Sequence, residues 1–211
     1  MIPAEFTECY ELQLAAYKKN RNPGHAERVA DLRTLHRMLV ENHDALVDAV
    51  NKDFGCRCAF ETKFAETFMA QDATLDAIKH LKKWMKPIRR HLDPTQFPLA
   101  RAWTFPQPVG VVGVVVPWNF PIAMAFQPLI GIIAAGNRAM IKMSENSNHL
   151  ALLLKQISPK YFPDDKLAFF GDLRTLRCNR NALAQPGGHV GALAIENALV
   201  RDEMGQFMRN D

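Results

Sequence analysis

Apolar residues recur every three or four positions through much of residues 1–95, which is the spacing of helices that bury one face. We therefore predict an N-terminal helical region over this range. Two of its buried faces are formed by Val29, Leu32, Leu35 and Leu39, and by Leu46, Val47 and Val50.

A further helical pattern begins with Phe60, Phe64 and Phe68 and continues until Pro87 stops it. We interpret the three phenylalanines as core residues rather than as a cofactor-binding feature. Basic residues gather toward the end of this helix, and we interpret them as a solvated helix end rather than as a phosphate-binding patch. They are Lys82, Lys83, Lys86, Arg89 and Arg90.

The pattern changes in residues 102–137, which contain no Asp, Glu, Lys, Arg or His. A membrane span is one interpretation of so long an uncharged stretch, but its repeated prolines oppose it. A valine-rich strand over 110–116, a turn and a buried helix over 121–135 explain it better, because β-branched residues suit a strand covered on both faces. Gly136-Asn137 then marks the end of the helix.

Two more strands, over 138–143 and 167–170, and one more helix, over 147–161, follow this pair. The order β-α-β-α-β is one half of a doubly wound parallel sheet. The carboxyl ends of such strands meet at one edge, where ligands bind. We therefore expect Trp118-Asn119 and Ser144-Glu145 to share a crevice there.

The fold class is therefore α/β, with four regions along the chain. The helical region at 1–95 is followed by an extended, aromatic-bearing strand at 96–107 and by a partial Rossmann-like domain at 108–172. Residues 173–211 form a tail that contains Arg but no Lys, with one amphipathic helical pattern over 192–208.

Composition narrows the class of protein. The chain has 211 residues, a net charge of +4 and 48% hydrophobic residues, which suits one or two domains with a sizeable core. Its four cysteines form no disulfide framework and its histidines lack ligand spacing, so we expect no metal site. Nothing indicates nucleic-acid binding, a signal peptide or a membrane span, and we expect a cytoplasmic location.

Three polar residues at the predicted strand ends are candidates for ligand contacts. Asn119 could donate its amide to a developing oxyanion or could cap the following helix, and spacing leaves both open. Lys142 could reach ligand hydroxyls or could face solvent, and Glu145 could accept from a ribose hydroxyl or favour a helix N-terminus. No Gly-x-Gly-x-x-Gly follows the first strand. We interpret Cys178, among arginines in the tail, as incidental because no base is in view.

Three segments resemble the aldehyde dehydrogenase superfamily. They are Pro108-Val109-Gly110-Val111-Val112-Gly113, Pro117-Trp118-Asn119-Phe120-Pro121 and Gly136-Asn137-Arg138-Ala139-Met140-Ile141-Lys142-Met143-Ser144-Glu145. The Met143-Ser144-Glu145-Asn146-Ser147 and Gly55-Cys56-Arg57 segments are most similar to coniferyl aldehyde dehydrogenases. The resemblance covers about residues 20–172.

The resemblance implies an oxidoreductase that oxidises an aldehyde, of coniferyl type or another, to the acid with NAD(P)+. It implies that a cysteine thiolate attacks the aldehyde, that Asn119 donates to the oxyanion, and that Lys142 and Glu145 contact the adenosine ribose. A carboxylate at Glu145 repels a 2′-phosphate, so NAD is expected, with NADP as the alternative. The family forms dimers or tetramers, and residues 96–107 resemble part of its oligomerisation arm, so we expect a homo-oligomer, a dimer, in the full-length form. The residues that would line the cofactor cleft are Val115, Val116, Pro117 and Trp118.

The resemblance stops after Gly171-Asp172. The family's Gly-Ser-Thr turn, Glu-Leu-Gly-Gly base segment and Gly-Gln-x-Cys nucleophile segment do not occur in the chain. We therefore expect a truncated, inactive form whose tail is translated out of frame, with a genuine divergent tail as the alternative. The alternatives are a non-catalytic nucleotide-binding module and an assembly fragment that uses the helices and the arm.

Overall fold

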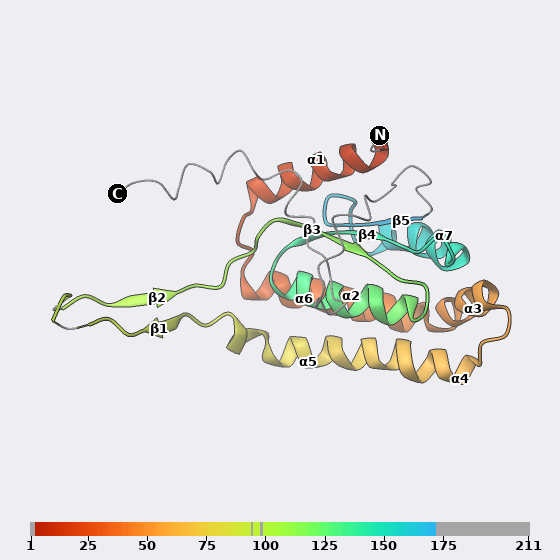
Figure 1. The fold of residues 1–211 in the computed structure, drawn as a ribbon, viewed down its shortest axis with the longest axis horizontal. Helices are drawn as coiled ribbons and strands as arrows, with labels where there is room; N and C mark the ends of the chain where they lie inside the picture. Colours follow the sequence, from red (N-terminus) through yellow and green to blue (C-terminus); the bar gives the residue numbers. More distant parts are fainter. Residues whose placement is uncertain (1–2, 94, 98, 172–211) are drawn as a thin grey trace, which may run out of the picture.

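The computed structural model describes residues 3–93, 95–97 and 99–171. A three-stranded parallel sheet lies between helix α1 (Ala4–Lys19) and a group of helices that covers its other face (Figure 1). Within that group α6 and α7 contact the strands, and the long N-terminal helices pack behind them. The helical elements other than α1 are α2 (His25–Glu41), α3 (His43–Phe54), α4 (Ala59–Thr62), the π-helix η1 (Lys63–Phe68), α5 (Met69–Trp84), α6 (Pro121–Ala134), α7 (Asn148–Ile157) and the 3₁₀ helix η2 (Ser158–Lys160).

The sheet confirms the predicted β-α-β-α-β order. Strands β3 (Val111–Val115), β4 (Arg138–Lys142) and β5 (Leu167–Phe170) are parallel and adjacent in that order. Their register places Val111 opposite Arg138 and Ala139 opposite Leu167. Helices α6 and α7 are the two crossovers, so all three strands end at the same edge.

Alternate residues of the strands face two different apolar layers, as the period of a strand requires. The side facing α6 and α7 carries Ala139, Ile141, Leu167 and Phe169, which belong to the main core together with the buried faces of α2 and α3. The side facing α1 carries Met140, Ala168 and Phe170, which form a smaller cluster with Phe6, Cys9 and Tyr10. Because both faces are covered, the strands contain the unbroken apolar runs that the sequence shows.

A β-hairpin projects away from the sheet and its helices (Figure 1). It pairs β1 (Ile88–Arg90) with β2 (Ala102–Thr104) in antiparallel fashion. The extended segment therefore begins earlier than predicted, at Ile88, and Gln96 and Phe97 lie in its connecting turn rather than on a strand. The predicted basic helix end is also wrong in part, because Arg89 and Arg90 belong to β1.

The three phenylalanines of the second helical pattern are not core residues. Phe60, Phe64 and Phe68 are 73%, 57% and 52% exposed and form a surface ladder in which successive rings stack. The prediction failed because the residues that face inward here are Glu66 and Thr67, in the π-helical segment between α4 and α5. A π-helix changes the angular step between residues, so a four-residue apolar repeat no longer marks the buried face.

Cys178 and the amphipathic pattern over 192–208 lie outside the described residues. In the part of the chain that the structure describes, no helix combines the length and the apolar character of a membrane-crossing segment.

Candidate functional site

Strands β3 and β4 end side by side and send their following residues out of one edge of the sheet. Val115 is the register partner of Lys142, and the Val116 backbone N–H donates to the Lys142 carbonyl at 2.9 Å. The segments that begin at Pro117 and at Met143 therefore leave the sheet from neighbouring positions. They meet at the carboxyl edge of the parallel sheet, where ligands bind in such folds, and the crevice itself stays a prediction.

The side chains at and after the end of β3 differ in their exposure to solvent. Val115 and Trp118 are 52% and 56% exposed, whereas Val116 is 2% exposed, so its side chain packs in the core and its backbone is the part able to face a ligand. The Trp118 ring lies 6.2 Å from the Phe54 ring. Asn119 is exposed, and its side-chain amide makes no hydrogen bond to any described residue. Of the two roles left open for Asn119, the helix cap is therefore absent among these contacts.

The segment after β4 carries a charged pair at the same edge. The Lys142 ammonium lies 3.3 Å from a Glu145 carboxylate oxygen, with the lysine half-buried and the glutamate exposed. The pKa of Glu145 is lowered, first by its own backbone N–H and then by Lys142, so the carboxylate stays ionised at neutral pH. A donor beside an acceptor is a suitable arrangement for a vicinal diol such as a ribose.

A basic side chain from the N-terminal region holds the segment that carries Asn119. The Arg57 guanidinium donates to the Asn119 carbonyl at 2.9 Å. It also stacks on the rings of Phe54 and Phe120, with its central carbon 4.8 and 4.7 Å from the two centroids. The arginine side chain itself is buried, whereas Asn119, whose carbonyl it binds, is exposed.

A buried glutamate completes this arrangement at the start of α6. One carboxylate oxygen of Glu66 pairs with Arg57 at 3.1 Å, and the other accepts the backbone N–H groups of Ile122 and Ala123 at 2.7 and 3.1 Å. Burial raises the pKa of Glu66, and its bonds to the α6 backbone and the charge of Arg57 oppose that rise. The unpaired amides of the first turn of α6 are thus satisfied by a carboxylate.

The first turn of α7 is closed in the same way by Asp53, whose side chain is buried. Its two oxygens accept the backbone N–H groups of His149 and Leu150 at 2.8 and 3.0 Å. Helix N-termini at a sheet edge are the usual sites for phosphate in dinucleotide-binding folds. Both are occupied by protein carboxylates here. The amide groups of these two helix starts are therefore already bonded within the protein.

Sequence reasoning did not identify Asp53 or Glu66, and it used Arg57 only as part of a resemblance. Their partners lie far along the chain, with 62 positions between Arg57 and Asn119 and 96 between Asp53 and His149. No local pattern encodes such a pair. The sequence does contain one relevant feature, the carboxylate of Glu66, which faces inward in the segment that carries the stacked phenylalanines.

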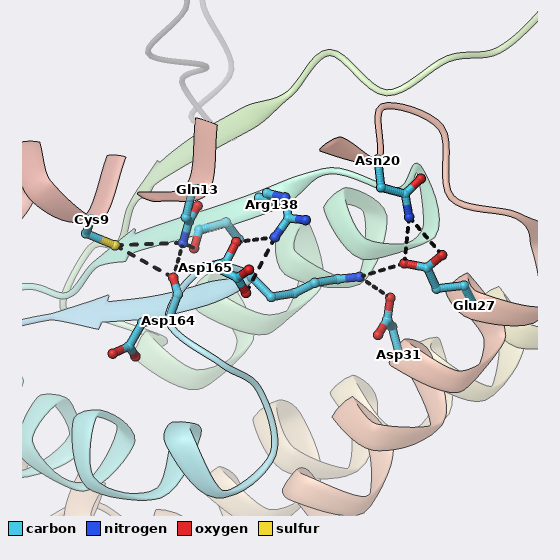
Figure 2. Close-up of polar contacts among 10 residues, drawn as sticks. Cys9, Gln13, Asn20, Glu27, Asp31, Arg138, Asp164 and Asp165 are labelled. Atoms are coloured by element: carbon cyan, nitrogen blue, oxygen red, sulfur yellow. Dashed lines mark hydrogen bonds and ion pairs between the residues drawn. The ribbon is translucent and has the colours of Figure 1, made fainter. Parts of the chain in front are cut away.

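The opposite edge of the sheet is filled with polar side chains that bind protein groups (Figure 2). The buried Gln13 amide donates to the carbonyls of Ala139 and Asp164 at 3.0 Å each. Arg138 pairs with Asp165, and Lys166 pairs with Glu27 and Asp31. Burial raises the pKa of the Cys9 thiol to about 11, and the charges of Asp164 and Glu5 add to the effect.

No cluster of three or more metal-ligating side chains occurs among residues 3–93, 95–97 and 99–171. The polar groups at the carboxyl edge are the amide of Asn119, the ammonium of Lys142 and the carboxylate of Glu145.

The chain is similar to known proteins along most of the described residues. The family model described as "Aldehyde dehydrogenase family" matches residues 3–170. A probable coniferyl aldehyde dehydrogenase of Pseudomonas aeruginosa is 44% identical over 156 residues, covering 74% of this chain and 33% of the relative. The coniferyl aldehyde dehydrogenase of Pseudomonas sp. strain HR199 is 40% identical over 170 residues, covering 78% and 34%. The chain thus spans about a third of the length of these curated relatives.

The fold is shared with solved structures. The substrate-bound AldH of Staphylococcus aureus matches with a TM-score of 0.74 at 24% identity, over 82% of this chain and 37% of that one. The indole-3-acetaldehyde dehydrogenase AldA of P. syringae, solved with NAD+, matches with a TM-score of 0.69 at 22% identity, over 80% and 33%. At this level of identity the likeness concerns the fold alone.

Proposed function

Because the chain belongs to the aldehyde dehydrogenase family, we propose that its described residues form the cofactor-binding part of an oxidoreductase that converts an aldehyde to the acid. The names of the most similar relatives favour an aromatic aldehyde of coniferyl type. The observation that carries the proposal is the arrangement of the carboxyl edge, where Asn119 and the Lys142–Glu145 pair leave adjoining strands with their polar groups available.

Asn119 is the oxyanion donor in this proposal. Its side-chain N–H groups would donate to the aldehyde oxygen as negative charge develops there. One such donor in a water-excluded site contributes about 3 kcal/mol to transition-state stabilisation. The exposed position of Asn119 and the absence of a hydrogen bond from its amide to any described residue support this role.

Lys142 and Glu145 bind the adenosine ribose of NAD, with Lys142 donating to and Glu145 accepting from the two hydroxyls. NAD is favoured over NADP because Glu145 stays ionised and repels a 2′-phosphate. When bound, the oxidised cofactor supplies the hydride acceptor. The cleft walls are Val115, the backbone of Val116, Pro117 and Trp118.

We propose that the hairpin of β1 and β2 is the oligomerisation arm of a homodimer. The chain was divided into regions 1–95, 96–107 and 108–172, and the arm region then begins at Ile88 instead of at residue 96. Its exposed apolar side chains, which include Trp103 and Phe105, support that use. The cytoplasmic location stays a prediction, as does the nature of residues 173–211.

We also propose that this chain alone turns over little or no aldehyde. Its sequence contains no Gly-Gln-x-Cys or Glu-Leu-Gly-Gly segment, and oxyanion binding does not replace a missing nucleophile. Nucleotide binding without turnover is then the activity that the chain itself retains.

Calorimetry of the full chain with NAD, followed by a spectrophotometric assay for NADH with aromatic aldehydes, tests the proposal. We expect measurable NAD binding that is weakened in Lys142→Ala and in Glu145→Ala and unchanged in Lys155→Ala, a lysine on α7 paired with the exposed Glu5. The proposal fails if NAD does not bind, or if all three variants bind equally. Rapid turnover abolished by Cys178→Ala would overturn the expectation of inactivity.

A further inference from the structure

We propose that Arg57 and Glu66 are positioning residues that fix the backbone around Asn119, an inference that rests on the role proposed above for Asn119. Neither side chain reaches the exposed edge itself, because both are buried beneath it. Their contacts instead converge on the segment between the end of β3 and the first turn of α6. They act on a ligand only through Asn119.

Arg57 anchors this segment at its carbonyl. The guanidinium contacts three oxygen-bearing groups: the Asn119 carbonyl, the Glu66 carboxylate and the exposed Glu61 carboxylate at 3.2 Å. A planar fork of donors meets them together while its faces stack on aromatic rings. An ammonium on a flexible stem cannot make the same set of contacts, so the site is specific for arginine.

Glu66 anchors the segment from its other side. It accepts from the N–H groups of Ile122 and Ala123, which follow Asn119 closely in the chain. The backbone of Asn119 is thus held at its own carbonyl and at the start of α6 by two side chains that also pair with each other. Its side-chain amide is the part left without a described partner.

The energetics favour a positioning role over a stabilising one. A buried ion pair loses in desolvation much of what it gains in attraction, so apolar residues of similar volume often stabilise a fold as well. The buried Nε of Arg57, the Glu66 oxygen that faces Arg57 and the buried hydroxyl of Thr62 also lack hydrogen-bond partners among the described residues, which adds to the cost. The placement of Glu66 on a π-helical turn is a further local cost. These costs are understandable if the pair fixes a geometry.

Backbone ¹⁵N relaxation of the full chain, without any ligand, tests the inference. In the wild type we expect an order parameter of about 0.85 for the backbone amide of Asn119. In Arg57→Lys we expect it to fall below about 0.6. The Leu150 amide, at the start of α7 and bound by Asp53, serves as an internal reference that keeps its value. Arg37→Lys is the matched control, because Arg37 also lies over an aromatic ring, that of Tyr161, on another part of the surface.

Chemical rescue separates positioning from general stabilisation. In Arg57→Ala we expect the Asn119 order parameter to fall and to recover with millimolar guanidinium but not with the same concentration of sodium. A purely structural role predicts loss of order along the whole of α6 and no recovery. If Arg57→Ala does not fold, Arg57→Lys, which keeps the charge opposite Glu66, remains the deciding variant. An Asn119 amide that stays ordered in Arg57→Lys overturns the inference.

The two proposals fail separately. Absence of NAD binding with a loss of Asn119 order in Arg57→Lys would reject the proposed function and leave the positioning role standing. NAD binding that depends on Lys142, together with an unchanged Asn119 order parameter, would reject the positioning role alone.

Discussion

The two edges of the parallel sheet use their polar side chains in opposite ways. At the amino edge, Gln13 and Arg138 bind backbone groups of neighbouring segments (Figure 2). Asn137 does the same by accepting from the N–H groups of Val109 and Gly110, and all three side chains are largely withdrawn from solvent. At the carboxyl edge, Asn119 and Glu145 are exposed. Among the described residues, Glu145 has only Lys142 as its ion-pair partner.

If the carboxyl edge binds a nucleotide as proposed, one sheet separates folding from binding. At the amino edge, the hydrogen-bonding capacity is consumed inside the protein, which fixes α1 and the strand starts. At the carboxyl edge, two buried carboxylates close the helix ends, and the groups above them keep donors and acceptors for something else. Changes at the two edges should therefore affect different measurements, and the following predictions test that separation.

The largest expected effect is the loss of the buried carboxylate beneath the carboxyl edge. Glu66→Ala leaves the buried Arg57 with the exposed Glu61 as its remaining counter-charge and removes the acceptor from the first turn of α6. Removing one partner of a buried ion pair costs about 3–5 kcal/mol. Urea unfolding should show this loss.

The control for that experiment is Glu61→Ala. Glu61 pairs with the same arginine but its side chain is 51% exposed, and a surface pair contributes at most about 1 kcal/mol. Equal losses in the two variants would show that Glu66 has no special place in the fold.

A smaller loss is expected at the amino edge. Gln13→Ala removes a fully buried amide and leaves the carbonyls of Ala139 and Asp164 without that donor, which costs about 1–3 kcal/mol. Urea unfolding measures the loss. The affinity for NAD, measured without urea, should not change, since the proposed nucleotide site lies at the other end of the strands. The exposed neighbour Glu11→Ala is the control, and weaker NAD binding in Gln13→Ala would break the separation of the edges.

At the carboxyl edge the expected change is in selectivity rather than in stability. Glu145→Gln removes the charge that repels a 2′-phosphate, so NADP should gain about 1 kcal/mol, roughly fivefold in Kd, relative to NAD. The free energy of unfolding should change by at most about 0.5 kcal/mol, because the pair with Lys142 is exposed on the glutamate side. Competition calorimetry with the two nucleotides measures the ratio, and an unchanged ratio would remove Glu145 from the ribose site.

The effect that is smallest at neutral pH concerns the pH dependence of stability, since it is seen only in alkaline solution. The folded protein holds the Cys9 proton up to a pKa of about 11, above the ordinary value of 9.0, so the unfolded chain loses this proton first as the pH rises. The stabilisation is therefore complete below about pH 9 and is lost between pH 9 and 11. Cys9→Ala should flatten this part of the stability curve. Cys56→Ala, at an exposed thiol, should not, and identical curves for both variants would contradict the assignment.

The sheet and its crossovers could be predicted from the sequence because their signals are local. Strand β5 was predicted at its observed bounds, and β3 and β4 within one residue at each end. β3 and β5 are apolar runs, and β4 contains one at 139–141 between Arg138 and Lys142, a pattern that favours strands covered on both faces. The common edge of Asn119 and Glu145 followed from the same pattern, since crossover handedness is almost invariant.

The contacts that organise the site could not be predicted, because they join residues distant in sequence. Nothing near Glu66 indicates that it accepts from Ile122, and nothing near Gln13 indicates Ala139. The prediction that Phe60, Phe64 and Phe68 lie in the core was wrong for a different reason. Its spacing was sound as a helical repeat, but a π-helical turn decides which side faces inward, and that turn depends on tertiary contacts.

The capping carboxylates also bear on how the nascent chain acquires this shape. The ribosome adds residues in order, so Asp53 and Glu66 emerge well before α7 and α6, whose amides they later accept. Until then both side chains can stay hydrated, and nothing charged has to be buried early. The α3–α5 segment thus carries acceptors prepared in advance, and each crossover helix can dock as soon as its first turn leaves the exit tunnel.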